Sequence, residues 1–414
     1  MHPIHVTSEI GKLKKVCLHR PGEELLNLHP DELENLLFDD IPFLEVAQQE
    51  HDAFADLMRN EGVEVVYLEK LVAEVFDKVP GTREEFLKQF LSEANIKGER
   101  VMQAAKERLE SIKDNYELVC KTMAGFTRAE LELPALSKNS LESYLGSTEE
   151  RDPLAVHPLP NLYFSRDPFA TVGNGVCVNH MYAHTRNRET LYGEFIFRYH
   201  PEYKDVQRWY HRDAQYHIEG GDILNLSRTA LAIGISQRTQ AAAIDTIAKN
   251  IFWHSEGCEI EKIFAFDIPA RRAFMHLDTV FTQIDYDKFT IHPAIMQTLR
   301  VLEITKGAKE DELKIEEHNG SIESILAYAL GIDSVKLILC AGGDPVAAAR
   351  EQWNDGSNTL CIEPGKIVVY QRNNVTNKLL EKEGLDLLVM PSAEVSRGRG
   401  GPRCMSMPFI REDI

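Results

Sequence analysis

The sequence lacks the features of a membrane, secreted or nucleic-acid-binding protein. No apolar run in the 414 residues is long enough to cross a bilayer, and the first residues hold no apolar signal segment. Basic residues are outnumbered, with 46 Lys and Arg against 65 Asp and Glu, and the formal net charge is -19. Such a surface repels nucleic acid and anionic lipid. We therefore expect neither nucleic acid nor a membrane as a partner.

The seven cysteines include no C-x-x-C pair, and their number is odd. This pattern argues against a disulfide framework or a structural zinc site and favours a reducing, cytoplasmic location. Six of the cysteines lie in apolar or mixed contexts, which is typical of small core residues. Cys404 differs, because it lies in RGRGGPRCMSMP (397–408), the densest run of arginine and glycine in the chain.

Residues 76–149 are expected to be helical and highly charged outside their apolar stripes. Thr82 and Glu85 have the spacing of a capping box, and the apolar residues that follow recur at helical intervals. We interpret this region as a helical bundle inserted into a larger domain. That larger domain would comprise residues 1–75 and 150–414.

The larger domain contains a repeat. Asp167, Asp222 and Asp278 each precede an apolar strand, a tight turn and a second strand, at intervals of about 55 residues. Looser copies follow Asp344 and begin at Gly11, and helical stretches lie between the copies. The pattern predicts an α/β fold of five ββαβ-type units closed into a five-bladed propeller, with polar residues of every unit converging on one central pocket.

Three copies carry polar residues at the same relative place. These residues are Arg166 and Asp167, then His217, Glu219 and Asp222, then His276 and Asp278. Acids beside a histidine and a cysteine favour nucleophilic catalysis with general acid–base help. An aspartate at the start of a strand also braces turns, and we prefer that plainer interpretation for Asp222 and Asp344.

A metal site is not expected. His217 and Glu219 form the His-x-Glu half of a zinc-deaminase signature, but the Pro-Cys-x-x-Cys half is missing from the sequence. Three arginines instead indicate a site for an anion, since a buried arginine requires one. They are Arg186, Arg238 and Arg399. A site with acids for a cation and arginines for a carboxylate suits a zwitterionic amino acid with a cationic side chain.

These residues lie in motifs that resemble those of bacterial arginine deiminases, in the guanidino-group modifying (pentein) superfamily. The motifs run nearly end to end and are LLFDDIPF, NLYFSRDPF, EGGD, MHLDTVF, REQWNDGSN and GRGGPRCMSMP. The resemblance implies a five-bladed α/β propeller with a helical insert. It also implies hydrolysis of L-arginine to L-citrulline and ammonia, the first step of the arginine deiminase pathway, without a metal or organic cofactor.

The resemblance also implies residue roles. Cys404 would be the nucleophile and His276 the proton shuttle, while the guanidinium would be held by Asp167, Glu219 and Asp278. The substrate carboxylate would be bound by Arg186, Arg238 and Arg399, and the pocket would be lined by Asn161, Phe164 and Leu37. The TRNRE segment also offers Arg188, and Arg186 is the preferred choice. Arg397 and Arg403 receive no role.

Several alternatives remain open at this point. An amidinotransferase or an agmatine-type deiminase of the same superfamily would use similar residues. An arginine-binding or adhesive surface protein would predict a degraded set of site residues, and a Cys–His–Asp protease would leave the three arginines unexplained. We further expect positive charge near Cys404, from the arginines or from bound substrate, to lower its thiol pKa below the usual value of about 8.5. A homo-oligomer, a dimer or higher, is the expected assembly.

Overall fold

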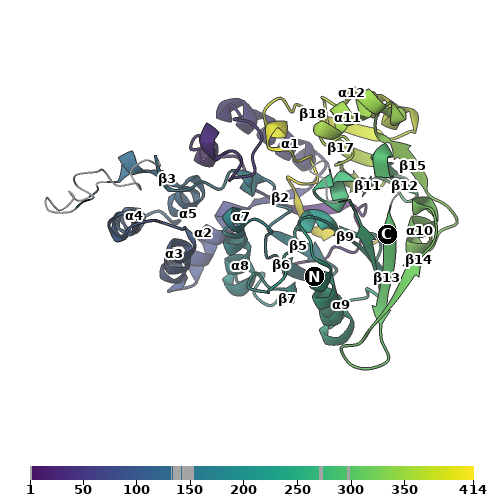
Figure 1. Cartoon of the computed structure of the whole chain (residues 1–414), viewed down its shortest axis with the longest axis horizontal. Coiled ribbons are helices and arrows are strands. Elements are labelled where there is room, and N and C mark those ends of the chain that lie inside the picture. Colours follow the sequence, from purple (N-terminus) through teal and green to yellow (C-terminus); the bar gives the residue numbers. More distant parts are fainter. Residues whose placement is uncertain (1, 132, 134–140, 142–152, 270–273, 296–298) are drawn as a thin grey trace.

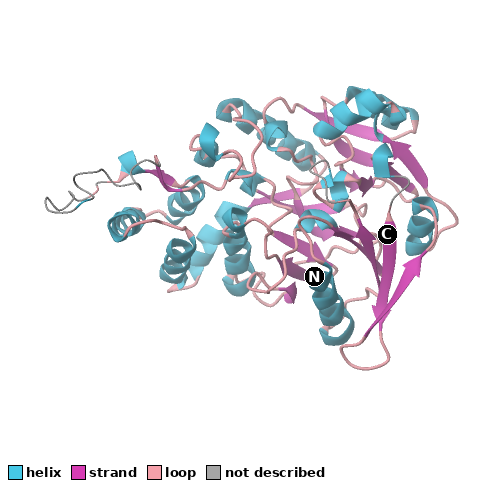
Figure 2. Cartoon of the chain, viewed as in Figure 1, coloured by secondary structure: helices cyan, strands magenta, loops and turns pink. Residues whose placement is uncertain are grey.

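The computed structural model describes residues 2–131, 133, 141, 153–269, 274–295 and 299–414 (Figure 1). These residues form a mixed α/β fold in which helices surround several small sheets rather than a single large one (Figure 2). None of the helices in these ranges is both long and apolar enough to span a bilayer.

Five sheets share one topology, in which a central strand pairs antiparallel with one neighbour and parallel with the other. They are β19–β1–β2 (Met407–Arg411, Leu13–Leu18, Glu64–Tyr67), β5–β6–β7 (Phe169–Val172, Gly175–Val178, Gln207–Tyr210), β8–β9–β10 (Ile223–Asn225, Ala230–Ile235, Lys262–Asp267), β11–β12–β15 (Phe281–Gln283, Lys288–Ile291, Lys336–Leu339) and β16–β17–β18 (Leu360–Glu363, Lys366–Tyr370, Asp386–Met390). The predicted strand pairs after Asp167, Asp222 and Asp278 are confirmed as β5–β6, β8–β9 and β11–β12.

Two further strand pairs complete the sheets of the described residues. The third sheet is extended by β13 (Arg300–Lys306) and β14 (Leu313–His318), which form the long ribbon at the lower right of Figure 1. A separate two-stranded sheet consists of β3 (Phe126–Thr127) and β4 (Leu154–Val156).

Helices connect the last two strands of each unit. They are α1 (Leu44–Asn60), α7 (His184–Asn187) with α8 (Thr190–Tyr199), α9 (Ala241–His254), α10 (Ile322–Leu330) and α12 (Asn374–Lys382), while α11 (Pro345–Trp353) joins the fourth unit to the fifth. Helix α9 shows how such a helix is held: Ala243, Ile244, Ile247, Ala248 and Ile251 recur on one face and are buried in the core. Three units follow the predicted ββαβ order along the chain, the fourth has β13 and β14 inserted before its helix, and the first takes its outer strand, β19, from the far end of the described chain.

A group of helices lies at one end of the long axis, on the same side as the two-stranded sheet of β3 and β4 (Figure 1). It consists of α2 (Leu68–Lys78), α3 (Thr82–Glu93), α4 (Glu99–Ser111) and α5 (Asn115–Ala124). The expected capping box is wrong, because α3 begins at Thr82 itself, after Gly81 with φ of 85°. The Thr82 hydroxyl instead donates to the carbonyl of Val79 at 2.7 Å. The predicted end of the insert at residue 149 lies outside the described residues.

The first and last strands of the described chain share one sheet. Strand β1 lies between β19 and β2, with Leu13 opposite Arg411. Short 3-10 helices precede three of the first strands: η5 (Pro160–Tyr163), η6 (Gly220–Asp222) and η8 (Leu277–Thr279), and η11 (Val395–Gly398) precedes the cysteine segment. This arrangement brings residues near both ends of the described chain to the starts of the first strands of these units.

Candidate active site

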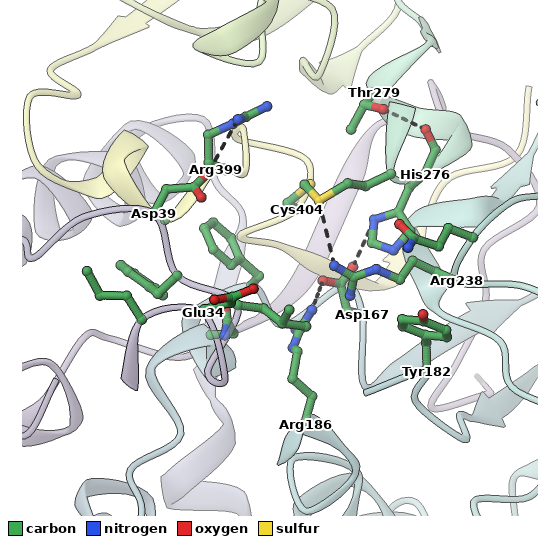
Figure 3. Close-up of a pocket in the computed structure, with 18 residues that line it drawn as sticks. Glu34, Asp39, Asp167, Tyr182, Arg186, Arg238, His276, Thr279, Arg399 and Cys404 are labelled. Carbon is green, nitrogen blue, oxygen red and sulfur yellow. Dashed lines mark hydrogen bonds and ion pairs between the residues drawn. The ribbon is translucent and has the colours of Figure 1, made fainter. Parts of the chain in front are cut away.

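A hollow of about 540 Å³ opens among these strand starts (Figure 3). The predicted site residues that line it are Leu37, Asn161, Phe164, Asp167, Arg186, Arg238, His276, Arg399 and Cys404. Glu219 and Asp278 are fully buried beside it, the first bonded to His276 and the second in contact with Cys404. The structure therefore gathers every predicted site residue around one hollow.

Equivalent backbone positions place Glu219 and His276. Each is the residue immediately before a 3-10 helix that leads into the first strand of a unit, Glu219 before η6 and His276 before η8. The two side chains meet, with Nε2 of His276 2.8 Å from Oε2 of Glu219. Gly221 makes this contact possible, because a Cβ there would lie 2.5 Å from Nδ1 of His276.

Acids on both sides of the ring control the protonation of His276. Its Nδ1 lies 3.8 Å from Oδ1 of Asp167, and both side chains are buried. Burial alone would lower the pKa of His276, but Asp167 and Glu219 outweigh it and raise the pKa to about 9. The imidazole therefore carries a proton at neutral pH, as a general acid requires.

Arg186 and Arg238 approach the same acids. Nη1 of Arg186 donates to Oδ2 of Asp167 at 3.1 Å, and its Nε and Nη2 form a fork on Glu189. Nη1 of Arg186 and of Arg238 lie 3.7 and 3.4 Å from Oε2 of Glu219. Burial alone would raise the pKa of Glu219, but Arg238, His276 and Arg186 hold it below its usual range.

Arg188, the other arginine of the TRNRE segment, lies elsewhere. Its Nη2 donates to the carbonyl of His157, and its side chain lines a separate hollow. The preference for Arg186 over Arg188 thus agrees with which of the two side chains lines the pocket.

Cys404 is buried, and its sulfur faces a carboxylate. Sγ lies 3.6 Å from Oδ2 of Asp278, and the Cys404 amide donates to Oδ1 of Asn358 at 3.1 Å. Burial, Asp278 and Asp167 raise the pKa of the thiol well above its usual value. The expected lowering by arginines is therefore wrong for the free protein, because burial and the neighbouring acids dominate.

Two carboxylate oxygens near the thiol lack hydrogen bonds. Oδ1 of Asp167 and Oδ1 of Asp278 are buried and accept no hydrogen bond from any described residue. Leaving a buried acceptor unsatisfied costs about 1–3 kcal/mol. Asp278 lies 3.6 Å from the sulfur through its other oxygen, Oδ2, and the charges of both aspartates act on the Cys404 thiol.

Arg399 projects from the turn before Cys404. Its backbone has φ of 63°, its Nη1 lies 3.3 Å from Oδ2 of Asp39, and its guanidinium stacks 3.7 Å above the ring of Trp353. Gly400 beside it packs directly on Phe164, since a Cβ there would lie 2.3 Å from the ring. The fixed turn holds the guanidinium at the edge of the hollow.

Asp222 and Asp344 have the structural roles that were preferred for them. Asp222 accepts from the Leu277 amide at 2.8 Å and from the hydroxyls of Ser236 and Thr239. Asp344 caps the start of α11. His217 also lies outside the pocket lining, where its Nδ1 contacts the Arg238 carbonyl at 2.8 Å.

A metal ion is a poor match for this site. Asp167, Glu219 and His276 offer ligand atoms within 4.8 Å of one another. However, Oε2 of Glu219 is already bonded to His276, and the guanidinium groups of Arg186 and Arg238 lie beside it. These cations would repel a metal ion, so the acids suit an organic cation of delocalised charge better.

Sequence reasoning missed several residues of the site. Asn358 links Cys404 to Asp278, because its Nδ2 donates to the carbonyl of Asp278 while its Oδ1 accepts from the Cys404 amide. It lies in the REQWNDGSN motif, which was the one available signal. Asp39 of LLFDDIPF and Trp353 of REQWNDGSN also lie in quoted motifs, but their contacts with Arg399 depend on folding and could not be predicted from the motifs.

Comparisons with known proteins agree on one family. The family model described as arginine deiminase matches residues 34–411. Arginine deiminases of Treponema denticola and Streptococcus gordonii are each 58% identical to the chain, covering all of it and 100% and 99% of their own lengths.

Solved structures show the same kind of fold at much lower identity. SxtG, an amidinotransferase from Microseira wollei, matches with a TM-score of 0.56 at 14% identity, covering 100% of this chain and 98% of its own. A dimethylarginine dimethylaminohydrolase variant matches with a TM-score of 0.51 at 13% identity, covering 96% of this chain and 100% of its own. The structures support the fold, and the full-length relatives decide the family: the chain belongs to the arginine deiminases.

Proposed function

We propose that this arginine deiminase hydrolyses L-arginine to L-citrulline and ammonia through a covalent intermediate on Cys404. The observation that carries the proposal is that Asp167 and Asp278 both act on the Cys404 thiol while the Oδ1 atom of each accepts no hydrogen bond from any described residue. A planar guanidinium between them would satisfy both acceptors and place its central carbon at the thiol. Neither a metal nor an organic cofactor is required.

The far end of the substrate would meet the arginines. Three donors of Arg186 are used by Glu189 and Asp167, so two of its five N–H groups remain for the substrate carboxylate. Arg238 and Arg399 line the same hollow and would supply further donors. Glu219 would keep its hydrogen bond to His276 and act on the guanidinium by its charge.

Substrate binding would also activate the nucleophile. The free thiol is held neutral by burial and by Asp278 and Asp167. A bound guanidinium offsets those negative charges, which favours loss of the thiol proton to solvent. The thiolate then forms a bond to the guanidinium carbon and gives a neutral tetrahedral adduct.

His276 would carry the proton through both halves of the reaction. The imidazolium donates its proton to one terminal amino group, the C–N bond breaks, and ammonia leaves a thiouronium cation on Cys404. The neutral ring then takes a proton from water as the hydroxide adds to the same carbon. The C–S bond breaks, the thiolate returns, and the hydroxyl proton leaves as citrulline forms.

The test is incubation with arginine and no added amine, followed by acid quenching and mass spectrometry of the Cys404 peptide. The deiminase proposal predicts citrulline and an adduct equal to arginine minus ammonia, since the carbon chain stays attached. An amidinotransferase would release ornithine first and leave only the bare amidino group. Absence of both citrulline and any adduct would refute the proposal.

We further propose that the five like units form a closed five-bladed α/β propeller. The shared topology of the five sheets and the pairing of β1 with β19 support it. In this interpretation residues 1–75 and 150–414 are the catalytic domain and 76–149 the helical insert, and α2 (Leu68–Lys78) runs from the one into the other. A cytoplasmic location and a homo-oligomer, a dimer or higher, remain predictions, which cell fractionation and light scattering would test.

A further inference from the structure

Arg403, the residue before the nucleophile, is fully engaged by buried partners. Its Nε and Nη2 each lie 3.0 Å from a carboxylate oxygen of Glu9. Nη1 donates to Oδ2 of Asp278 at 2.8 Å, and Nη2 also donates to the carbonyl of Ile223 at 2.8 Å. Its side chain is 1% exposed, so this guanidinium is fixed inside the protein.

Asp278 links Arg403 and Glu9 to Cys404. Its Oδ2 accepts from Arg403 and lies 3.6 Å from Sγ of Cys404, while its Oδ1 accepts no hydrogen bond. A carboxylate is planar, so fixing one oxygen also fixes the direction of the other. Arg403 thereby determines where the unpaired oxygen points.

Glu9 secures the other side of the network. Its Oε1 accepts from the Asn225 amide at 3.0 Å as well as from Arg403. Burial alone would raise the pKa of Glu9, but Arg403 and Arg166 lower it to about 2. Glu9 is therefore charged at any working pH and holds the arginine fork in one orientation.

We propose that Arg403, held by Glu9, is a positioning residue for the deimination reaction: it binds Oδ2 of Asp278 so that Oδ1 faces the incoming guanidinium. The inference rests on the proposed function. A lysine at position 403 keeps the charge but cannot contact Glu9 and Asp278 through one rigid fork. Charge alone therefore does not satisfy the proposal, which requires the guanidinium geometry.

The experiment compares two matched reagents on Cys404, the cationic chloroacetamidine and the neutral chloroacetamide. In the wild type the amidinium pairs with the open acids, so the cationic reagent alkylates Cys404 faster. Arg403→Lys is expected to lower this rate ratio about tenfold and kcat for arginine about 10- to 100-fold. Glu9→Gln should lower the ratio by a smaller factor, because it loosens the fork without removing it.

Arg411→Lys is the matched control. Arg411 is an equally buried arginine, but it bonds the carbonyls of Gly11 and Cys361 instead of Asp278. This variant should lose stability and keep the wild-type rate ratio and kcat. Equal losses in the Arg403 and Arg411 variants would overturn the positioning role, as would an unchanged ratio in a folded Arg403→Lys protein.

A double-mutant cycle tests whether Arg403 acts through Asp278. In an Asp278→Asn background, Arg403→Lys should produce no further change in the rate ratio, because the residue it positions is already gone. A full additional decrease would overturn the proposal. The ratio requires no turnover, so it is independent of citrulline formation: a wild type that made no citrulline would refute the proposed function alone.

Discussion

Two hollows of this protein are each built around a buried histidine between two carboxylates. In the active-site pocket His276 lies between Asp167 and Glu219. In a second hollow of about 440 Å³, beside α2 and α5, His19 contacts Glu69 at 2.8 Å and Glu24 at 3.1 Å. In both places the acids outweigh burial and raise the histidine pKa, to about 9 for His276 and about 10 for His19.

The difference between the hollows lies in what surrounds the histidine. The active site adds Cys404, two open acceptors and a group of arginines that line the pocket. The second hollow also contains a cysteine, Cys120, and there too burial and a carboxylate, Glu69, raise the thiol pKa, to about 12. A histidine–carboxylate pair is therefore a stable structural element here, and catalysis depends on the groups added to it.

The largest contrast is expected between the two cysteines. Cys404→Ser should lower kcat by a factor on the order of 10⁴ or more, because it removes the nucleophile. Cys120→Ser should leave kcat and KM at wild-type values. Citrulline formation by the two purified variants measures both effects, and a similar loss in each would remove the distinction between the hollows.

Substitutions of the two histidines should impair different properties, catalysis for His276 and folding stability for His19. His276→Asn is expected to lower kcat about 10²- to 10⁴-fold, since it removes the proton carrier. His19→Asn leaves Glu24 and Glu69 buried without their cation, which costs about 3–5 kcal/mol of folding stability. Its kcat, measured well below the melting temperature, should be unchanged. A catalytic defect in folded His19→Asn protein would give the second hollow a role in the reaction.

The pH dependence of stability sharpens the same comparison. The raised pKa of His19, about 10 in the folded protein, means that its contribution is complete below the usual value of about 6.5. That contribution is lost as the pH rises toward 10, by an amount on the order of 3 kcal/mol. Urea unfolding at pH 6.5, 8 and 9.5 should show a steeper loss for wild type than for His19→Asn, and equal slopes would contradict the assignment.

The smallest expected difference is between the effects on KM of substituting one arginine from each hollow, Arg399 and Arg20. Arg399→Ala should raise KM for arginine at least about tenfold, from loss of a charge-assisted contact worth about 1.5–3 kcal/mol, with little effect on agmatine, which has no carboxylate. Arg20 lines the second hollow and pairs with Asp52, so Arg20→Ala should change neither value. Equal losses on arginine and agmatine in the Arg399 variant would refute the carboxylate role.

The sequence predicted those structural features that depend on residues close together in the chain. The strand pairs after Asp167, Asp222 and Asp278 follow from local apolar patterns and turns, and the structure confirms them. The Thr82 capping box failed because Gly81 allowed α3 to start at Thr82 itself. Such boundary details depend on competing local hydrogen bonds that differ little in energy.

Contacts between residues far apart in the chain could not be predicted from the sequence. Glu9 and Arg403 are 394 positions apart, and no motif links them. The direction of the Cys404 pKa shift was also missed, because nearby arginines are visible in the sequence while burial and facing acids are not. The resemblance of the motifs identified the site residues. The side chains that pair with them, such as Asp39 with Arg399, were identified only from the structure.

The pairing of β1 with β19 has a consequence for how the enzyme is made. Strand β19 ends at Arg411, and the nucleophile lies only a few positions before that strand. Until β19 has been synthesised, β1 lacks one of its two partner strands and Cys404 has no place in the pocket. Catalytic activity should therefore appear only after synthesis has passed Arg411, so that a stalled or prematurely terminated chain cannot consume arginine.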